Sequence, residues 1–291
     1  MLLAIIRLAV GTSSLLYALI SDVRTRIVEN YPWQIMGIVG FLFLFYEHTT
    51  LLTTKEVMLC ILPIVMFADA VIDRDESKIE IIVTTASYAI SAFLFLYAVF
   101  FLRIYTGEAR IVIALTLSLA LVYFLYLIHA IHGGADAKAF MSIAVLHPMP
   151  YAFMVAGLPI LRCDIAIFPP ILSIIVYSGV PIVFIPIYYL VYNVYHRNIR
   201  FPHMLLGVPR DTKNMRFWLP MLVVDEKGNL REKLLPKRSV DYEKVIDELR
   251  RRGISRVWAM YKTPFMVMIL PAYIFYALVG DIMCILSAIF G

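Results

Sequence analysis

The sequence predicts an all-α polytopic membrane protein of about eight transmembrane helices, with a small α+β module before the last helix. Of the 291 residues, 62% are hydrophobic and only 16% are charged. Soluble domains average about 45–50% apolar and about 25% charged residues. Several stretches have almost no charge over about 20 residues, enough to cross a hydrocarbon core of about 30 Å. Most basic residues instead gather in one polar segment near the C-terminus.

The first five predicted spans alternate across the membrane. The first, residues 2–20, is followed by Arg24 and Arg26, which place that end in the cytoplasm by the positive-inside rule and the N-terminus outside. It lacks a basic start and a small-residue cleavage site, so we expect a retained span and not a removable signal peptide. The next four spans follow at residues 33–46, 57–72, 79–102 and 111–131.

Prolines distinguish the later spans. Residues 137–160 are interrupted by Pro148 and Pro150, and residues 165–195 carry four more prolines, at positions 169, 170, 181 and 186. Proline removes a backbone donor and kinks a helix, so we expect these spans to bend around a protein-lined or watered cavity. The alternative is that proline is simply commoner in membrane helices. Residues 264–285 form the last span, which ends outside.

The polar segment, residues 196–261, predicts a small cytoplasmic module. Residues 221–224 and 230–235 flank a turn that contains glycine, which is typical of a β-hairpin. Ser239 is the expected N-cap of a helix over residues 240–252, and Gly253 its C-terminal stop. Residues 254–261 predict a further strand. The predicted organisation is therefore three parts: transmembrane helices 1–7 over residues 1–195, the basic module over 196–261, and the final helix over 262–291.

The charge of this module indicates its partner. Residues 196–262 contain 16 of the chain's 26 Lys and Arg but only 8 of its 21 acidic residues. A basic segment beside membrane spans is typical of the cytoplasmic face, where it meets anionic lipid. We expect no nucleic acid partner, because the segment is tethered to the membrane and holds no recognisable nucleic-acid module.

Neither a metal nor a cofactor is expected. The three cysteines are scattered and form no Cys-x-x-Cys pair, which excludes the usual zinc and redox motifs. His129 and His132 lie three residues apart, but nothing in the sequence completes a ligand set around them, so two interfacial histidines are the better interpretation.

Two aspartates at the edges of apolar segments carry the functional prediction. Counting spans puts both Asp22 and Asp136 at cytoplasmic helix ends. Asp136 follows Gly133, Gly134 and Ala135, a setting that also suits a solvated helix N-cap. Two carboxylates a few ångströms apart cannot both ionise cheaply, so such a pair holds one proton. The ionised member then takes a proton from water while the protonated member polarises a peptide carbonyl, which needs no metal.

The residues around these aspartates resemble a known family. Ser21-Asp22-Val23-Arg24-Thr25-Arg26, with Asn30, resembles the first aspartate motif of the type IV prepilin peptidases. Gly133-Gly134-Ala135-Asp136-Ala137-Lys138 resembles their second motif, Gly-x-Gly-Asp, in its archaeal form. Trp258 through Thr263-Pro264-Phe265 to Gly280-Asp281 is similar to the final span of archaeal preflagellin peptidases, and the basic module resembles their cytoplasmic domain.

The resemblance implies a metal-independent aspartic endopeptidase of the cell membrane. Such enzymes remove the short basic leader of preflagellin and pilin-like (class III) precursors at the cytoplasmic face. It implies Asp22 and Asp136 as catalytic, Gly133, Gly134 and Ala135 as structural members of the motif, and Lys138 as a supporting residue. Lys138 is equally readable as a cation that snorkels toward the interface.

The chain departs from the family pattern in three places. Ala135 stands directly before Asp136, and Glu29 stands where many members have proline. The third departure is spacing: 114 residues separate Asp22 from Asp136, about two membrane spans more than the resemblance implies. Spans added in a pair preserve sidedness, so the departure affects helix pairing and substrate choice more than catalysis.

A basic leader needs acidic contacts, and we expect them from Glu29, Asp73, Asp75 and Glu76. The main alternative is a proton-coupled transporter, since acids and kinked helices also line transport pathways. Asp69 fits that reading too, but no internal repeat supports it. A presenilin-like protease shares the pair chemistry but is expected to have Tyr before the first aspartate, where this chain has Ser21.

Overall fold

The computed structural model describes residues 2–52, 55–72, 77–104, 107–131, 133–150, 169–224, 229–234 and 240–290. The described chain is mostly helical with a small amount of sheet. It divides into two compact units: a helical unit of Met1–Ser178 with Pro264–Gly291, and a mixed unit of Gly179–Thr263.

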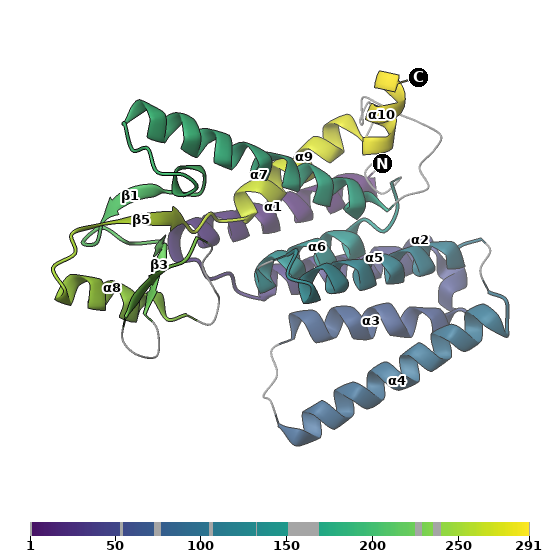
Figure 1. The fold of residues 1–291 in the computed structure, drawn as a ribbon. Helices are drawn as coiled ribbons and strands as arrows, with labels where there is room; N and C mark the ends of the chain where they lie inside the picture. The colour runs from purple at the N-terminus through teal and green to yellow at the C-terminus, as the bar shows by residue number, and fades with distance from the viewer. Residues whose placement is uncertain are drawn as a thin grey trace. The chain divides into compact units, whose positions relative to one another are not determined.

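Antiparallel helices build most of the helical unit (Figure 1). Their order follows the predicted spans closely over the first five. The helices are α1 (Leu2–Thr25), α2 (Tyr31–Glu47), α3 (Val57–Val71), α4 (Lys78–Phe100), α5 (Ala109–Leu127), α6 (Gly134–Leu146), the start of α7 (Pro170–Tyr195), α9 (Met266–Val279) and α10 (Ile282–Phe290), with a short 3₁₀ turn at Thr49–Leu52.

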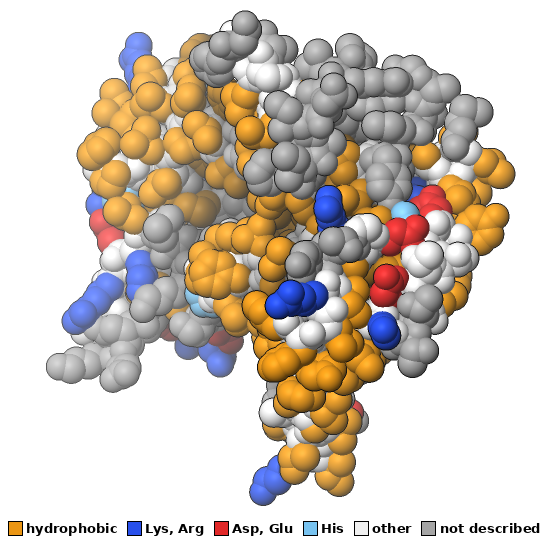
Figure 2. Space-filling model, turned by 90° about the vertical axis from the view of Figure 1, so that its right-hand side faces the viewer, with side chains coloured by type: hydrophobic (Ala, Val, Ile, Leu, Met, Phe, Trp, Pro, Cys, Tyr) orange, Lys and Arg blue, Asp and Glu red, His pale blue; other side chains and the backbone are white. Residues whose placement is uncertain are grey.

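Four of these helices, α1, α4, α5 and α7, are long and apolar enough to cross a membrane, and α3 and α9 are shorter apolar helices. The surface agrees with that composition. Only 6% of the most apolar window of α4 is buried, and hydrophobic side chains cover much of the face in Figure 2. Such extensive exposed apolar surface is unfavourable in water and suits lipid. The protein is therefore a membrane protein, while the count of eight spans stays a prediction.

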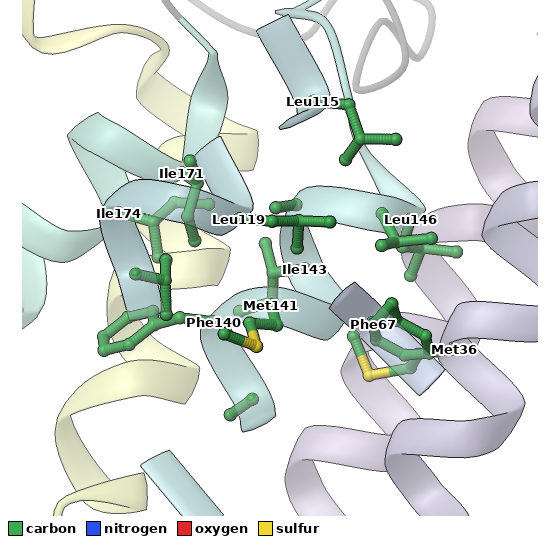
Figure 3. Close-up of a cluster of buried hydrophobic side chains, with 14 of the residues drawn as sticks. Met36, Phe67, Leu115, Leu119, Phe140, Met141, Ile143, Leu146, Ile171 and Ile174 are labelled. Carbon is green, nitrogen blue, oxygen red and sulfur yellow. The ribbon is translucent and has the colours of Figure 1, made fainter. Parts of the chain in front are cut away.

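Helix α6 lies at the centre of the helical core. Every residue from Ala139 to Leu146 is buried, and α6 packs against α1, α2, α3 and α5. Figure 3 shows the apolar side chains that meet there: Met36, Phe67, Leu115, Leu119, Phe140, Met141, Ile143, Leu146, Ile171 and Ile174. Helices α2 and α6 approach each other closely, since a Cβ on Gly40 would lie 2.6 Å from the backbone oxygen of Val145. Small residues permit such contacts between membrane helices.

Two predicted spans differ from the structure. Helix α6 ends at Leu146 because the Pro148 that follows His147 cannot continue it; residues 151–160 of that span lie outside the described residues. The last span breaks at Gly280, whose φ of 111° favours glycine. The Asp281 carboxylate then accepts from the backbone N of Met283 at 2.8 Å and caps α10.

Polar side-chain contacts stabilise one end of the helical unit, where α1 begins and α2 ends. Arg7, 1% exposed, donates to both carboxylate oxygens of Glu47 at 2.8 Å. Nearby, Glu108 accepts from the Thr50 hydroxyl and lies 3.1 Å from His48 Nδ1. These contacts hold the pKa of Glu108 below its ordinary value, and the hydrogen bond from Thr50 has the largest effect. The bidentate geometry of the buried pair makes it a strong link between α1 and α2.

The mixed unit joins the second half of α7 to a three-stranded antiparallel sheet. The strands are β1 (Val208–Asp211), β5 (Arg256–Tyr261) and β2 (Trp218–Pro220), in the spatial order β1-β5-β2. The amide of Asn193, near the end of α7, donates to the carbonyls of Met204 and Gly207 at 2.9 and 2.8 Å. The helix and the strands are thereby joined as one body.

The predicted hairpin is confirmed: β3 (Leu222–Val224) pairs antiparallel with β4 (Leu230–Glu232). The predicted strand over residues 254–261 is β5. The predicted helix is α8 (Tyr242–Arg251), but its N-cap is Asp241, which accepts from the backbone N of Lys244 at 3.3 Å. The cap prediction at Ser239 was wrong because Asp241 is an equally good capping residue two positions later. Gly253, with φ 70°, follows the helix end as predicted.

Candidate active site

Asp22 lies in the last turn of α1, whose end is tied back on itself by side chains. Ser21 donates to the carbonyl of Ile27 at 2.6 Å, and Thr25 donates to the carbonyl of Ser21 at 2.9 Å. Arg26, with φ 62°, ends the helix and donates to the carbonyl of Asp22 at 3.2 Å. These bonds tie the residues that follow α1 back to the last turn of the helix. Asp22 is half-buried on a fixed helix end.

Asp136 occupies the first turn of α6, three residues after the N-cap Gly133. Its carboxylate folds back over that glycine: a Cβ on residue 133 would lie 2.0 Å from Asp136 Oδ2 and 2.7 Å from its Cγ. Any other residue type at position 133 therefore collides with the carboxylate. Gly133 has ordinary extended dihedrals, φ −94° and ψ 133°. The glycine is required by space and not by backbone conformation.

Gly134 stands in contrast to Gly133. The nearest atom to a Cβ built there is the Tyr126 hydroxyl, at 3.9 Å. The residue is exposed, so the backbone beside Asp136 is open to an approaching chain. Ala135, between Gly134 and Asp136, is half-buried and packs against the apolar core of the helical unit.

A hydrogen bond joins the two motif segments. Lys138 Nζ, on α6, donates to Asn30 Oδ1 at 2.7 Å. Asn30 is the residue before α2, and its side chain makes no N-cap bond to that helix. The short distance to a cationic donor makes this one of the stronger side-chain bonds in the unit. The bond connects two residues that are 108 positions apart in the sequence. It holds the segment that follows Asp22 against α6, the helix that carries Asp136.

A second bond extends this network to α3. Gln34, one turn into α2, donates to the carbonyl of Val71 at 3.2 Å. The end of α3 therefore lies next to the start of α2 and one helix turn from Asn30. The sequence did not predict the contact made by Gln34 or the role of Asn30 as a hydrogen-bond acceptor. Both residues are polar and belong to no apolar helical stripe, so no sequence pattern marks them.

The remaining predicted site residues are less informative. Glu29 is exposed in the segment between α1 and α2, which is compatible with a contact to a substrate. Asp73, Asp75 and Glu76 lie outside the described residues.

Residues 200–282 match a family model described as Archaeal Peptidase A24 C-terminus, Type II. This part of the chain is similar to the C-terminal region of archaeal A24 peptidases. This confirms the resemblance to prepilin and preflagellin peptidases predicted from the motifs. A search of curated proteins finds no match.

The family match and the aspartate motifs are independent lines of evidence. The matched A24 region runs from the mixed unit through α9 to the start of α10, and it contains neither Asp22 nor Asp136. Two separate parts of the chain thus point to the same family. A protease that acts on precursor proteins is the activity that the family supports.

Proposed function

We propose that this chain is a multi-pass aspartic endopeptidase that removes the short basic leader from preflagellin or pilin-like precursors at the cytoplasmic face. The observation that carries the proposal is the Lys138–Asn30 bond, which joins the two aspartate-bearing segments at one end of the helical unit. The A24 match supports the class of substrate. A transporter is not favoured by that match.

The helix positions support different roles for the two aspartates. Asp136 lies at the N-terminus of α6, where the helix macrodipole stabilises a negative charge, and Asp22 lies at the C-terminus of α1, where the macrodipole disfavours one. We therefore propose Asp136 as the general base and Asp22 as the general acid. Titration belongs to the pair as a whole.

Cleavage then follows from these roles. Asp136 takes a proton from water as the water oxygen attacks the scissile carbonyl carbon, and Asp22 donates its proton to the carbonyl oxygen. When the tetrahedral intermediate collapses, the carbon–nitrogen bond breaks and the leaving nitrogen receives the proton held by Asp136, while Asp22 recovers its own. Neither a metal nor a covalent intermediate takes part. The open backbone at Gly134 lets an extended substrate approach the carboxylate.

The proposed topology places the N-terminus outside and the active site in the cytoplasm. Arg24 and Arg26 follow the first span, and the basic segment of residues 196–261 precedes the last. Both distributions fit the positive-inside rule. The basic segment also has the charge to contact anionic lipid. Glu29, Asp73, Asp75 and Glu76 remain our candidates for contacts with a basic leader.

The test is cleavage of a preflagellin-like precursor in membranes by the parent and by Asp22→Asn and Asp136→Asn. Asparagine preserves shape but cannot exchange the proton, so each change should lower the rate by about 10²–10⁴-fold. Asp247→Asn, at an exposed position of α8, is the matched control and should cut like the parent. If either active-site variant cuts normally at equal protein level, the two-aspartate mechanism is wrong.

A further inference from the structure

A groove between α3 and α4 has no role in the proposed chemistry. The two helices are in contact, and an open pocket of about 360 Å³ lies between them. That volume is near the lower limit of the roughly 300–1,000 Å³ of small-ligand pockets. Ala68 of α3 and Ile72, directly after that helix, line one wall, and α4 contributes Glu80, Thr84 and Ser87.

The groove combines an apolar wall with negative charge. Glu80 is half-buried, and its Oε2 atom is shielded from solvent without a hydrogen-bond partner among the described residues. Asp69, next to the lining residue Ala68, accepts from the Tyr88 hydroxyl at 2.9 Å and fixes α3 to α4. The described residues that line the groove include no Lys or Arg. A shielded carboxylate is costly without a counter-charge, so the groove suits a cationic ligand.

The groove lies beside the candidate active site. Ile72, one of its lining residues, directly follows Val71, whose carbonyl accepts from Gln34. Gln34 is one turn from Asn30, which accepts from Lys138. The groove therefore begins at the same end of the helical unit as both aspartate motifs.

We infer that this groove receives a Lys or Arg side chain of the precursor's leader. The inference rests on the proposed function and deepens it, because it assigns leader recognition to the α3–α4 pair. The apolar wall covers the methylene stem of such a side chain while its charged end reaches Glu80. The amine of a lipid headgroup has the same charge and is the competing occupant.

The first test measures binding and not cleavage. The probe is a fluorescent peptide with two lysines ahead of an apolar helix, and its partner has norleucine in place of both lysines. Binding is measured to the full chain in phosphatidylcholine nanodiscs, in an Asp136→Asn background that prevents consumption of the probe. Glu80→Gln should weaken binding of the lysine peptide roughly tenfold, the usual scale for one charged hydrogen bond. Binding of the norleucine peptide should not change.

Glu56→Gln is the matched control. Glu56 precedes α3 at the opposite end from the groove, and it too has a shielded carboxylate oxygen. This variant should bind both peptides like the parent. A second variant, Ala68→Phe, fills the groove without touching a charge and should weaken the lysine peptide as well. Thermal unfolding of each variant, compared with the parent, separates lost binding from lost folding.

The outcomes distinguish the two proposals. If Glu80→Gln and Ala68→Phe both bind the lysine peptide like the parent, the groove is not the leader site, whatever the cleavage assay gives. If Glu80→Gln instead lowers only the retention of phosphatidylethanolamine from mixed nanodiscs, the occupant is lipid and the inference fails. Failure of the proposed function would appear in the cleavage assay instead. Either the parent protein would cut no precursor, or the Asp22→Asn variant would still cut.

Discussion

Replacing Gly133 by alanine should disable the enzyme without unfolding it. The added Cβ would lie 2.0 Å from Asp136 Oδ2, and real Cβ contacts essentially never fall below 3.0 Å. The carboxylate must therefore move by about 1 Å, and a displacement of that size at a reacting group costs about 10²-fold in rate. The displaced atoms are the end of a side chain, so the strain is limited to roughly 0.5–1.5 kcal/mol for an off-rotamer Asp136.

Comparison of three glycine variants isolates this effect. Gly134→Ala makes the same chemical change one position later but meets nothing closer than 3.9 Å. Its kcat should stay near that of the parent, and any loss should fall on KM because the substrate approaches there. Gly179→Ala, with no atom within 4 Å, controls for the general effect of removing a helical glycine. The assay is precursor cleavage with kcat and KM resolved, alongside thermal unfolding in detergent. A Gly133→Ala enzyme with the parent's kcat would refute the reasoning.

Three further predictions concern the polar contacts. Lys138→Met leaves the half-buried Asn30 oxygen without its donor and should destabilise the protein by about 1–3 kcal/mol and reduce cleavage; an unchanged melting temperature and rate would contradict this. Arg7→Met strands the Glu47 carboxylate and should cost about 3–5 kcal/mol by thermal unfolding, whereas Arg7→Met with Glu47→Leu should recover most of that loss. Because the pKa of Glu108 is lowered by folding, its contribution to stability is complete above its unfolded pKa of about 4.5 and lost as the pH falls through the lower folded value. Melts of the parent between pH 6 and pH 3 should therefore fall more steeply than those of Glu108→Gln, and parallel curves would count against the contact.

Local patterns predicted most of the elements but few of the contacts that connect them. The ranges of α1 to α5, the hairpin and Gly253 follow from apolar runs and turn residues, which are properties of short windows. The bond between Lys138 and Asn30 joins residues 108 positions apart, and no window reports such a pairing. Strand β1 was missed because Val208–Asp211 is short and contains a proline, which lowers any strand signal.

The candidate site shows the same division. The aspartates and glycines were identified from their resemblance to family motifs, whereas the reason for Gly133 required coordinates. From the sequence alone, the expected role of Gly133 is to give the backbone conformational freedom. In the structure its dihedrals suit any residue, and the space is taken by the carboxylate that it precedes.

The Arg7–Glu47 pair also has a consequence for how the chain enters the membrane. A lone arginine within a membrane helix is costly, and its partner is made 40 residues later. In the proposed topology α1 and α2 therefore insert as one hairpin, with Asp22 and Asn30 near its turn. The first aspartate motif is then in place while Asp136 is still to be synthesised. In the proposed mechanism the chain therefore holds only one carboxylate of the pair until residue 136 of 291 has been made, and it cannot cleave a precursor before then.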